Sequence, residues 1–275
     1  MYYFCLYLMN AVLALTTFSS NDLLYLSDAL PVQWWLADCE SYNQHETDGV
    51  HHRCFHQPFQ CSDTIVTQFT DDSGASFSIQ ALDEDGVELF SDEFNKDGEI
   101  YTYSFVPSVF DICDEKIQLK IIDETSPESV AAFSDALDIK SAQEKTTLIT
   151  YYNSNRNFAG LQYADVSPDI TFYARIPSIF FHQRAVTQQT VVETSSMVVN
   201  TSGTFKWQKT LETGYIPYYM HKKLALILKH QFIEIEDKDW LLEESYEIIE
   251  GDRRWPLKKA RVILTDKNSI TRNIL

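Results

Sequence analysis

The sequence predicts an all-β protein, mainly antiparallel, made of two β-sandwich-like modules with little helix. Three observations favour this class: apolar and polar residues alternate with a period of two, turn-forming pairs such as Asp85-Gly86 separate the alternating runs, and Tyr and Phe are abundant while Gly and Pro number only eight each. Period-two alternation places successive side chains on opposite faces of a strand. Aromatic residues favour strands as well.

Three alternating runs between residues 63 and 122 predict the strands of the first module. Their apolar residues are Phe77, Ile79 and Ala81, then Tyr101, Tyr103 and Phe105, then Ile117, Leu119 and Ile121. Asp72-Ser73-Gly74, Asp85-Gly86 and Asp97-Gly98 lie between candidate strands and tolerate the positive φ angles of tight hairpins. We therefore expect this stretch to form an antiparallel meander, which would be half of a sandwich.

A polar run at residues 140–145 marks the expected domain boundary. Before it, Ser126-Pro127-Glu128 predicts the start of a short helix, with Ser as N-cap and Pro at the first helical position. Beyond it, strands are expected at Ile170–Ile176 and over 203–211, 231–236, 244–250 and 259–265, while Leu224–Lys229 fits either helix or strand. We expect an acidic β-sandwich-like domain over residues 1–142 and a second β-rich domain over residues 143–275.

Charge divides the chain at almost the same place. Residues 1–145 hold 26 Asp and Glu against 6 Lys and Arg, a net charge of −20, whereas residues 146–275 hold 14 against 16, a net charge of +2. The acidic half argues against a nucleic-acid partner, because phosphate binding needs clustered Lys and Arg. Faces of opposite charge could attract one another within a chain or between copies.

The first fifteen residues are apolar and uncharged, and three interpretations compete for them. A secretion signal normally has a basic region at its start, but the first basic residue here is Arg53. The run is also too short to span a bilayer. A buried N-terminal strand or an assembly arm fits better, so we expect no membrane span and a cytoplasmic product that later joins a particle.

A dense cluster of Cys and His suggests metal chemistry. Its members are Cys39, His45, His51, His52, Cys54, His56 and Cys61. Zinc prefers such ligands, but there is no Cys-x-x-Cys knuckle. A disulfide among Cys39, Cys54 and Cys61 and an ordinary polar loop with free thiols are the alternatives, and the loop is favoured. No metal or cofactor is predicted, and Cys5 and Cys113 are expected in buried, strand-like contexts.

Catalytic motifs are missing from the sequence. It contains no Gly-x-Ser-x-Gly, no His-Glu-x-x-His, no phosphate-binding Gly-rich loop and no dinucleotide fingerprint. Asp83, Glu84 and Asp85 could serve acid–base chemistry or calcium, but Asp85-Gly86 fits a hairpin tip better. A Cys–His nucleophile pair stays open, because such partners meet in space rather than in sequence. We predict a non-enzyme without catalytic residues.

Aromatic and basic groups offer further candidates. Asn200-Thr201-Ser202 matches a glycosylation sequon but is favoured as a turn. Trp34-Trp35 and the group Tyr215, Tyr218 and Tyr219 could bind sugars, although core or interface packing is the commoner use. The basic groups are His221-Lys222-Lys223, Arg253-Arg254 and Lys258-Lys259. They could meet the acidic half of a neighbouring copy or could be solvated strand faces.

Several ordered segments carry a family resemblance. They are Pro58-Phe59-Gln60, Asp63-Thr64-Ile65 and Gln68-Phe69; Ser134-Asp135-Ala136-Leu137-Asp138-Ile139; Leu148-Ile149, Tyr152-Asn153-Ser154 and Asn157-Phe158-Ala159-Gly160; Arg175-Ile176-Pro177; and Trp255-Pro256-Leu257-Lys258-Lys259-Ala260. In their order they resemble structural proteins of tailed phages and prophages of Bacteroidota hosts, including crAss-like phages. The Cys/His-rich loop departs from that pattern.

The resemblance implies a β-sandwich component of a tail, baseplate or head-to-tail neck ring, located in the virion. Its partners would be copies of itself in a ring and other tail or neck proteins, because complementary faces set the register of a heterologous ring. Two other classes stay open: a carbohydrate-binding module for host attachment, and a hydrolase with an unrecognised site.

Overall fold

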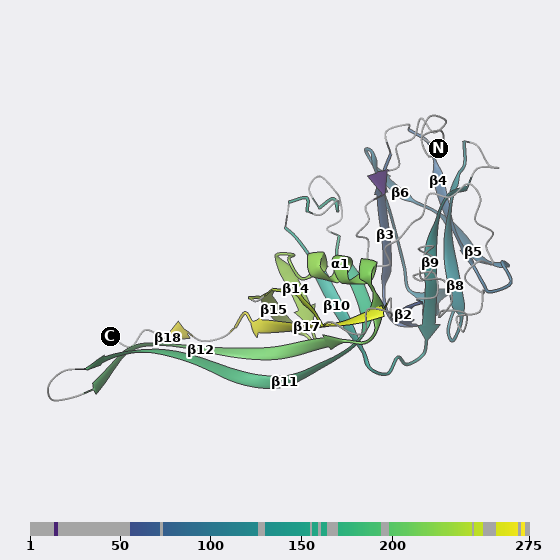
Figure 1. The fold of residues 1–275 in the computed structure, drawn as a ribbon. Helices are drawn as coiled ribbons and strands as arrows, with labels where there is room; N and C mark the ends of the chain where they lie inside the picture. The colour runs from purple at the N-terminus through teal and green to yellow at the C-terminus, as the bar shows by residue number, and fades with distance from the viewer. Residues whose placement is uncertain are drawn as a thin grey trace, which may run out of the picture. The chain divides into compact units, whose positions relative to one another are not determined.

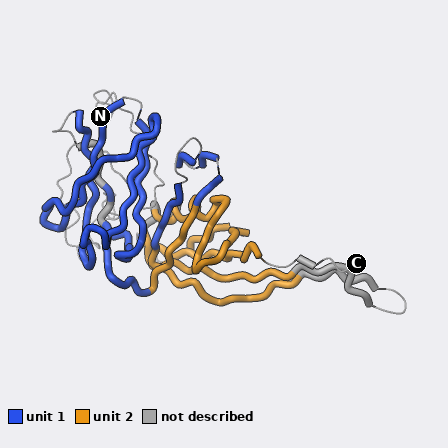
Figure 2. The backbone as a smooth tube through the Cα atoms, turned by 180° about the vertical axis from the view of Figure 1, so that it is seen from behind, with its two compact units in different colours: residues 1–144, 152–175 blue, residues 145–151, 176–275 orange. Residues whose placement is uncertain are grey.

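A computed structural model describes residues 14–15, 56–71, 74–125, 130–154, 156–158, 161–163, 170–193, 198–243, 245–249, 257–268 and 271–272. The chain forms two compact units (Figure 2). Unit 1 comprises Met1–Glu144 and Tyr152–Arg175, and unit 2 comprises Lys145–Tyr151 and Ile176–Leu275. The chain first leaves unit 1 two residues after the expected boundary at 142. It then returns for residues 152–175, which the sequence predicts in the second domain.

The elements of unit 1 are β1 (Ala14–Leu15), β2 (Gln57–Gln60), β3 (Ile65–Thr70), β4 (Phe77–Leu82), β5 (Glu88–Glu93), β6 (Asn95–Asp97), β7 (Ile100–Phe105), the 3-10 helix η4 (Pro107–Phe110), β8 (Lys116–Asp123) and β9 (Val130–Lys140) (Figure 1). Those centred on unit 2 are β10 (Thr146–Tyr152), β11 (Phe172–Glu193), β12 (Val198–Thr213), β13 (Ile216–Pro217), α1 (Tyr218–Ile227), β14 (Phe232–Ile235), β15 (Lys238–Leu242), β16 (Glu247–Ile249), β17 (Leu257–Asp266) and β18 (Thr271–Arg272). The all-β prediction is confirmed.

Unit 1 is a sandwich of two sheets, with strand orders β1-β3-β7-β6 and β2-β9-β8-β4-β5. Both sheets contribute to one core, which is rich in aromatic residues. Phe69 stacks on Tyr101 at 5.0 Å between ring centroids and meets Phe77 and Phe94 edge to face. The alternating residues of β4, β7 and β8 fill this core, as the sequence predicted.

The predicted meander is wrong, because the strands between 63 and 122 are shared between the two sheets. β3 pairs with β7, and β4 lies between β5 and β8. Alternation assigns a side chain to a face but does not select the strand that pairs with it. The expected tips at Asp85-Gly86 and Asp97-Gly98 are confirmed as hairpins, with Gly86 at φ 77° and Gly98 at φ 61°.

One pairing in unit 1 is parallel, between β2 and β9. The returning segment also packs on unit 1, since the Gln68 side chain binds both backbone groups of Gln162. Its Oε1 accepts from Gln162 N at 2.8 Å and its Nε2 donates to Gln162 O at 3.1 Å. Gln68 alternates with the core residue Phe69, so this segment lies on the side of β3 away from the core.

Unit 2 contains one sheet that closes on itself. Its order β17-β15-β14-β10-β11-β12 is completed by pairing between β12 and β17, so six strands form a ring, with β13, β16 and β18 attached. Buried apolar residues fill it, including Leu211, Val262, Leu264, Ile235 and Trp240. The Trp240 Nε1–H donates to the carbonyl of Ile235 at 3.0 Å, which satisfies its polar group.

Helix α1 resolves the ambiguity at residues 224–229. It covers Tyr218–Ile227, and Leu224 and Ile227 are buried on it. Spacings of three and four are those of one helix face, so the helical period prevails here. The helix begins six residues before the ambiguous stretch, within a segment that no helical pattern had marked.

β11 and β12 continue beyond the closed sheet as a paired ribbon (Figure 1). β12 pairs with β17 over Gln208–Glu212, whereas its pairing with β11 extends to residue 198. A bulge between Phe181 and Arg184 places His182 at φ 54° where the ribbon leaves the closed sheet. Asn200-Thr201-Ser202 lies in β12, so its interpretation as a turn is wrong.

The remaining predictions concern the N-terminal apolar run and segments outside the described residues. Ala14–Leu15 form β1, paired with β3, which matches a strand at that end of the apolar run. The helix expected at Ser126-Pro127-Glu128, the residues Trp34 and Trp35, and the basic pair Arg253-Arg254 lie outside the described residues.

Candidate functional site

A disulfide joins Cys61 to Cys113 in unit 1. The favoured expectation of a polar loop with free thiols is therefore wrong for Cys61, and so is the alternative that paired Cys61 with Cys39 or Cys54. Cys113 lies in the loop after η4, not in a strand, and is half-buried. The two Cα atoms are 5.5 Å apart although 52 residues separate them along the chain. The partner could not be chosen from spacing, because sequence does not determine disulfide connectivity.

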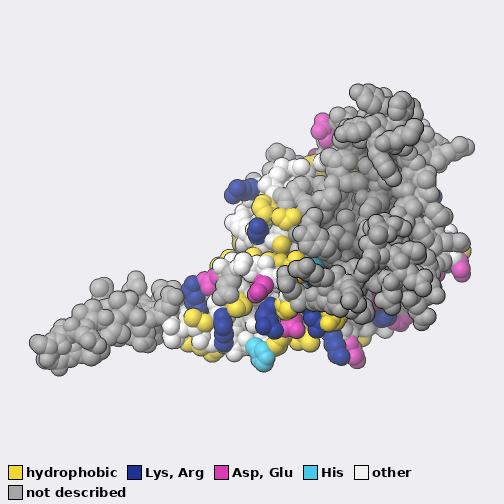
Figure 3. Space-filling model, viewed as in Figure 1, with side chains coloured by type: hydrophobic (Ala, Val, Ile, Leu, Met, Phe, Trp, Pro, Cys, Tyr) yellow, Lys and Arg dark blue, Asp and Glu magenta, His cyan; other side chains and the backbone are white. Residues whose placement is uncertain are grey.

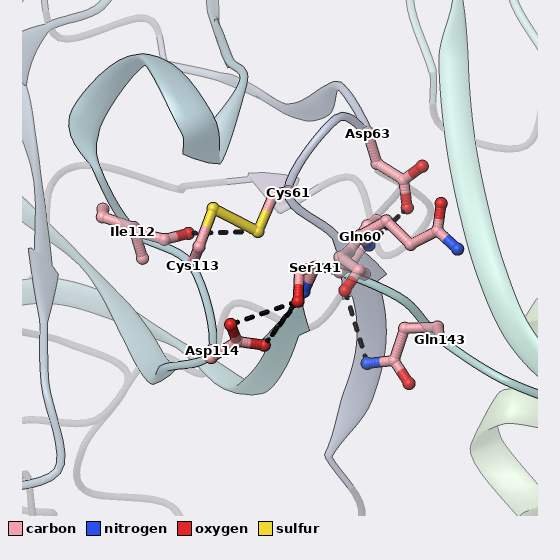
Figure 4. The surroundings of a disulfide bond; sticks show 9 residues. Gln60, Cys61, Asp63, Ile112, Cys113, Asp114, Ser141 and Gln143 are labelled. Atoms are coloured by element: carbon pink, nitrogen blue, oxygen red, sulfur yellow. Dashed lines mark hydrogen bonds between the residues drawn. A yellow bond between two sulfur atoms is a disulfide. The ribbon is translucent and has the colours of Figure 1, made fainter.

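The disulfide belongs to a network of hydrogen bonds at the end of β2 (Figure 4). Ser108 N donates to Cys61 O, and Cys61 N donates to Lys140 O, both at 3.0 Å. Asp114 accepts from the backbone and hydroxyl of Ser141 at 3.0 and 3.1 Å, and the Gln143 amide donates to Phe59 O at 3.3 Å. These bonds fix the chain just before it leaves unit 1 at Glu144.

The point where the chain leaves unit 1 for the last time is held by a buried ion pair. Arg175 binds Asp63 with two hydrogen bonds, Nε to Oδ2 at 2.6 Å and Nη2 to Oδ1 at 2.8 Å. Their side chains are 8% and 3% exposed. Asp63 Oδ2 also accepts from Gln60 N at 2.7 Å. The Asp63 carboxylate therefore has a partner at both oxygens, and the pair links the residues just before β3 to the end of the returning segment.

Of the candidate zinc ligands, only His56 and Cys61 lie among the described residues. Cys61 is used by the disulfide, and burial lowers the pKa of His56. Cys39, His45, His51, His52 and Cys54 lie outside the described residues. Within the described part of the chain, no three His, Cys, Asp or Glu side chains gather where they could hold a metal ion.

The carboxylates at 83–85 form the predicted hairpin tip. Asp83 Oδ1 accepts from Asp85 N at 2.9 Å and from Val87 N at 2.8 Å, and Gly86 N donates to Asp83 O at 3.0 Å. These bonds close the β4–β5 connection, which is the structural interpretation that the sequence favoured.

Two buried histidines of unit 2, His221 and His230, lie on α1 and just after it. His221 is buried, with Nδ1 2.7 Å from the Tyr246 hydroxyl and Nε2 3.0 Å from Lys258 O. His230 lies after the helix, where its Nδ1 is 3.1 and 3.0 Å from the carbonyls of Leu226 and Ile227. Burial lowers the pKa of both histidines.

The predicted alternative of a Cys–His nucleophile pair finds no free thiol in the described part of the chain. Its two cysteines, Cys61 and Cys113, are bonded to each other.

The predicted basic clusters differ in exposure. His221 and Lys223 are buried on α1, so their interpretation as a solvated strand face is wrong. Lys259 lies on β17 with its Nζ 4.9 Å from the ring centroid of Tyr215, which is 60% exposed. We call this pair the Tyr215–Lys259 knob. Figure 3 shows further Lys and Arg side chains over the β11, β12 and β17 region, among hydrophobic and acidic ones.

Each unit has a surface hollow. The hollow of unit 1, here named the aromatic hollow, encloses about 290 Å³ and is lined by Thr64, Asp92, Tyr103, Ser104, Phe105, Val106, Val109 and Phe110. The hollow of unit 2 encloses about 260 Å³ and is lined by Thr146, Thr147, Leu148, Thr150, Glu234, Glu236 and Asp237. Neither lining includes a histidine that could act as the base for a Ser or Thr nucleophile.

The difference in net charge is slightly larger between the two compact units than between the two halves of the sequence. Unit 1 holds 28 Asp and Glu and 7 Lys and Arg, a net charge of −21, and unit 2 holds 12 and 15, a net charge of +3. The returning residues 152–175 are balanced, and Lys145 belongs to unit 2. The polarity is therefore a property of the folded units.

Comparisons with protein-family models and with curated protein sequences find no match to this chain. Among the described residues, no helix is long and apolar enough to cross a membrane.

Proposed function

We propose that this chain is a non-enzymatic structural subunit of a tailed-phage virion, repeated in a symmetric tail, baseplate or neck ring. The observation that carries the proposal is the charge of the two units, −21 and +3. A heterologous ring brings one face of a subunit against a different face of the next, and opposite charge favours that contact over contact between like faces.

The β11–β12 ribbon gives further support. β11 has 22 residues and its neighbour β10 has seven, so most of one edge of β11 extends past β10. Extended strand edges are templates for pairing with another chain. A subunit that assembles with its own copies can use such an edge.

Sedimentation velocity of the full chain across ionic strength tests the proposal. At about 0.1 M salt we expect a discrete multi-copy species, and at about 1 M salt we expect it to dissociate, because screening shortens the range of charge attraction to roughly 3 Å. A mass of one copy at every salt and protein concentration would contradict the proposal.

A carbohydrate-binding role is the second candidate, favoured by the aromatic hollow. Asp92 lies beside Tyr103 and Phe110 there, and aromatic faces with a neighbouring carboxylate suit sugar binding. Binding of the isolated protein to a glycan array, lost in the Asp92→Ala variant, would favour this role over assembly.

A further inference from the structure

The aromatic hollow lies at an open edge of the sandwich. β7 pairs with β3 along Ile100–Phe105, but on its other side β6 covers only Ile100–Thr102. Over residues 103–105, the described strands therefore leave that edge of β7 uncovered. β5 is likewise the last strand of its own sheet, and Phe90 is its one buried residue.

The lining of this hollow combines aromatic walls with polar groups. The Phe110 ring stacks on the Phe90 ring with 4.4 Å between centroids, and it packs edge to face on the Phe105 ring with 6.2 Å between centroids. Ring packing therefore holds Phe110 in place in the wall of the hollow. Asp92 accepts from the Tyr103 hydroxyl at 3.1 Å, and Thr64 and Ser104 add hydroxyl groups. Such a site suits a side chain that is apolar along its body and polar at its tip.

The surroundings of the hollow are acidic. β5 reads Glu-Leu-Phe-Ser-Asp-Glu, with three carboxylates and no basic residue, and all three are exposed. Asp111 directly follows η4 and is exposed as well. A cation beside the entering side chain would therefore be favoured over an anion.

The Tyr215–Lys259 knob of unit 2 has the complementary properties. Tyr215 is the most exposed large apolar side chain described in unit 2, and Lys259 lies over its ring. In the part of the chain that the structure describes, Lys259 makes no ion pair. Tyrosine is one of the residues enriched among the hot spots of protein interfaces.

We propose that the Tyr215–Lys259 knob of one copy inserts into the aromatic hollow of the next copy. The Tyr215 ring enters between Tyr103, Phe105 and Phe110, and the Lys259 ammonium meets Asp92. This inference rests on the proposed function, because it names the contact through which copies assemble.

Other exposed aromatic groups fit less well. Trp207 is 39% exposed, but the nearby lysines Lys206 and Lys209 already bind Glu243 and Glu236. Because Glu243 and Glu236 already neutralise these two lysines, the lysines attract the carboxylates around the hollow less strongly than an unpaired lysine would. Trp207 is therefore suited to serve as a control position.

Photo-crosslinking locates the contact directly. The full chain carrying Tyr215→p-benzoyl-phenylalanine is mixed with nitrogen-15-labelled unmodified protein under assembling conditions and irradiated. We expect a cross-linked product of two copies, with the linkage in the peptide that contains residues 103–110. The same photoreactive residue at Trp207 should not label that peptide.

Charge reversal provides an independent arm. Lys259→Glu and Asp92→Lys should each weaken assembly roughly 30-fold, the effect expected of an interface hot spot, and the double variant should recover most of it. Leu241→Ala, at an exposed apolar position on the same unit, should change assembly less than roughly threefold. Thermal melts of each variant verify folding.

The outcomes separate this inference from the proposed function. Assembly with the Tyr215 linkage elsewhere, linkage only within one copy, or no recovery in the double variant would overturn the inference and leave the ring proposal standing. A wild-type chain that never assembles would remove the proposed function and this contact together.

Discussion

The two units differ in how their sheets enclose a core and in what stabilises that core. Unit 1 stacks two sheets around aromatic rings and adds a disulfide and a buried Arg–Asp pair, and its residues sum to a net charge of −21. Unit 2 closes one sheet around aliphatic residues and Trp240, with a net charge of +3. The comparison suggests that covalent and ionic cross-links compensate unit 1 for the self-repulsion of its charge.

The largest effect that separates the units should come from the buried ion pair. Asp63→Asn leaves the Arg175 guanidinium buried without its carboxylate, so we expect unit 1 to lose about 3–5 kcal/mol of unfolding free energy. Calorimetry, together with urea unfolding monitored by circular dichroism, measures this loss. The unfolding transition of unit 2 should not move. Lys116→Ala is the control, because its pair with Glu84 is 43% and 45% exposed and should contribute less than about 1 kcal/mol. Equal losses in both variants would contradict this role of Asp63.

Removal of the disulfide should be the next largest effect. The double variant Cys61→Ser with Cys113→Ser opens a loop whose ends are 52 residues apart, and we expect about 2–4 kcal/mol of lost stability, again confined to unit 1. Urea unfolding of oxidised and reduced wild-type protein provides the matching comparison. If reduction lowered the stability of unit 2 as much as that of unit 1, the separation of the units would be contradicted.

Acid should act on unit 2 through its buried histidines. Burial lowers the pKa of His221 and His230 below the ordinary value of 6.5, so the unfolded chain binds more protons than the folded one as pH falls below that value. The stability of unit 2 is therefore complete above pH 6.5 and is lost as pH falls toward the lowered pKa values.

The variant His221→Gln with His230→Gln should show a shallower loss of unit 2 stability between pH 7 and pH 5 in thermal melts. An unchanged slope would mean that these two residues are not the titrating groups. The transition of unit 1 in the same melts serves as the internal reference, because both substitutions lie in unit 2.

The smallest effect is expected at the exposed network of unit 2. The Lys206 ammonium hydrogen-bonds Glu243 and holds the pKa of that carboxyl below its ordinary value. Lys206→Ala should raise that pKa toward the ordinary range while stability changes by less than about 1 kcal/mol. A carbon-13 NMR titration of the Glu243 carboxyl measures the shift. An unmoved pKa would assign the effect to Thr265 and Gln208, which also bind Glu243.

Local patterns predicted the elements of the fold better than their partners. The strands around Phe77, Tyr101 and Ile117 and the turn at Asp85-Gly86 follow from alternation and turn chemistry, which depend on adjacent residues. The sheet of each strand depends on contacts between distant residues, so the meander prediction failed. β5 escaped detection because Phe90 is its one buried residue, which leaves no alternation to detect.

The site residues illustrate the same limit. Asp63 and Arg175 are 112 residues apart, and nothing near either residue in the sequence indicates that they bind each other. Cys61 and Cys113 could not be paired for the same reason. The aromatic hollow is built from β5, β7 and η4, which three-dimensional packing brings together. Tyr215 and Lys259 belong to two different candidate groups of the sequence, the aromatic and the basic one, and the pairing of β13 with β17 brings them together.

Cryo-electron microscopy of the assembled particle tests the central claim most directly, because it shows which units meet between copies. The account predicts that each interface joins unit 1 of one copy to unit 2 of its neighbour, with Tyr215 in the aromatic hollow. Interfaces formed by like units, unit 1 on unit 1 or unit 2 on unit 2, would contradict it.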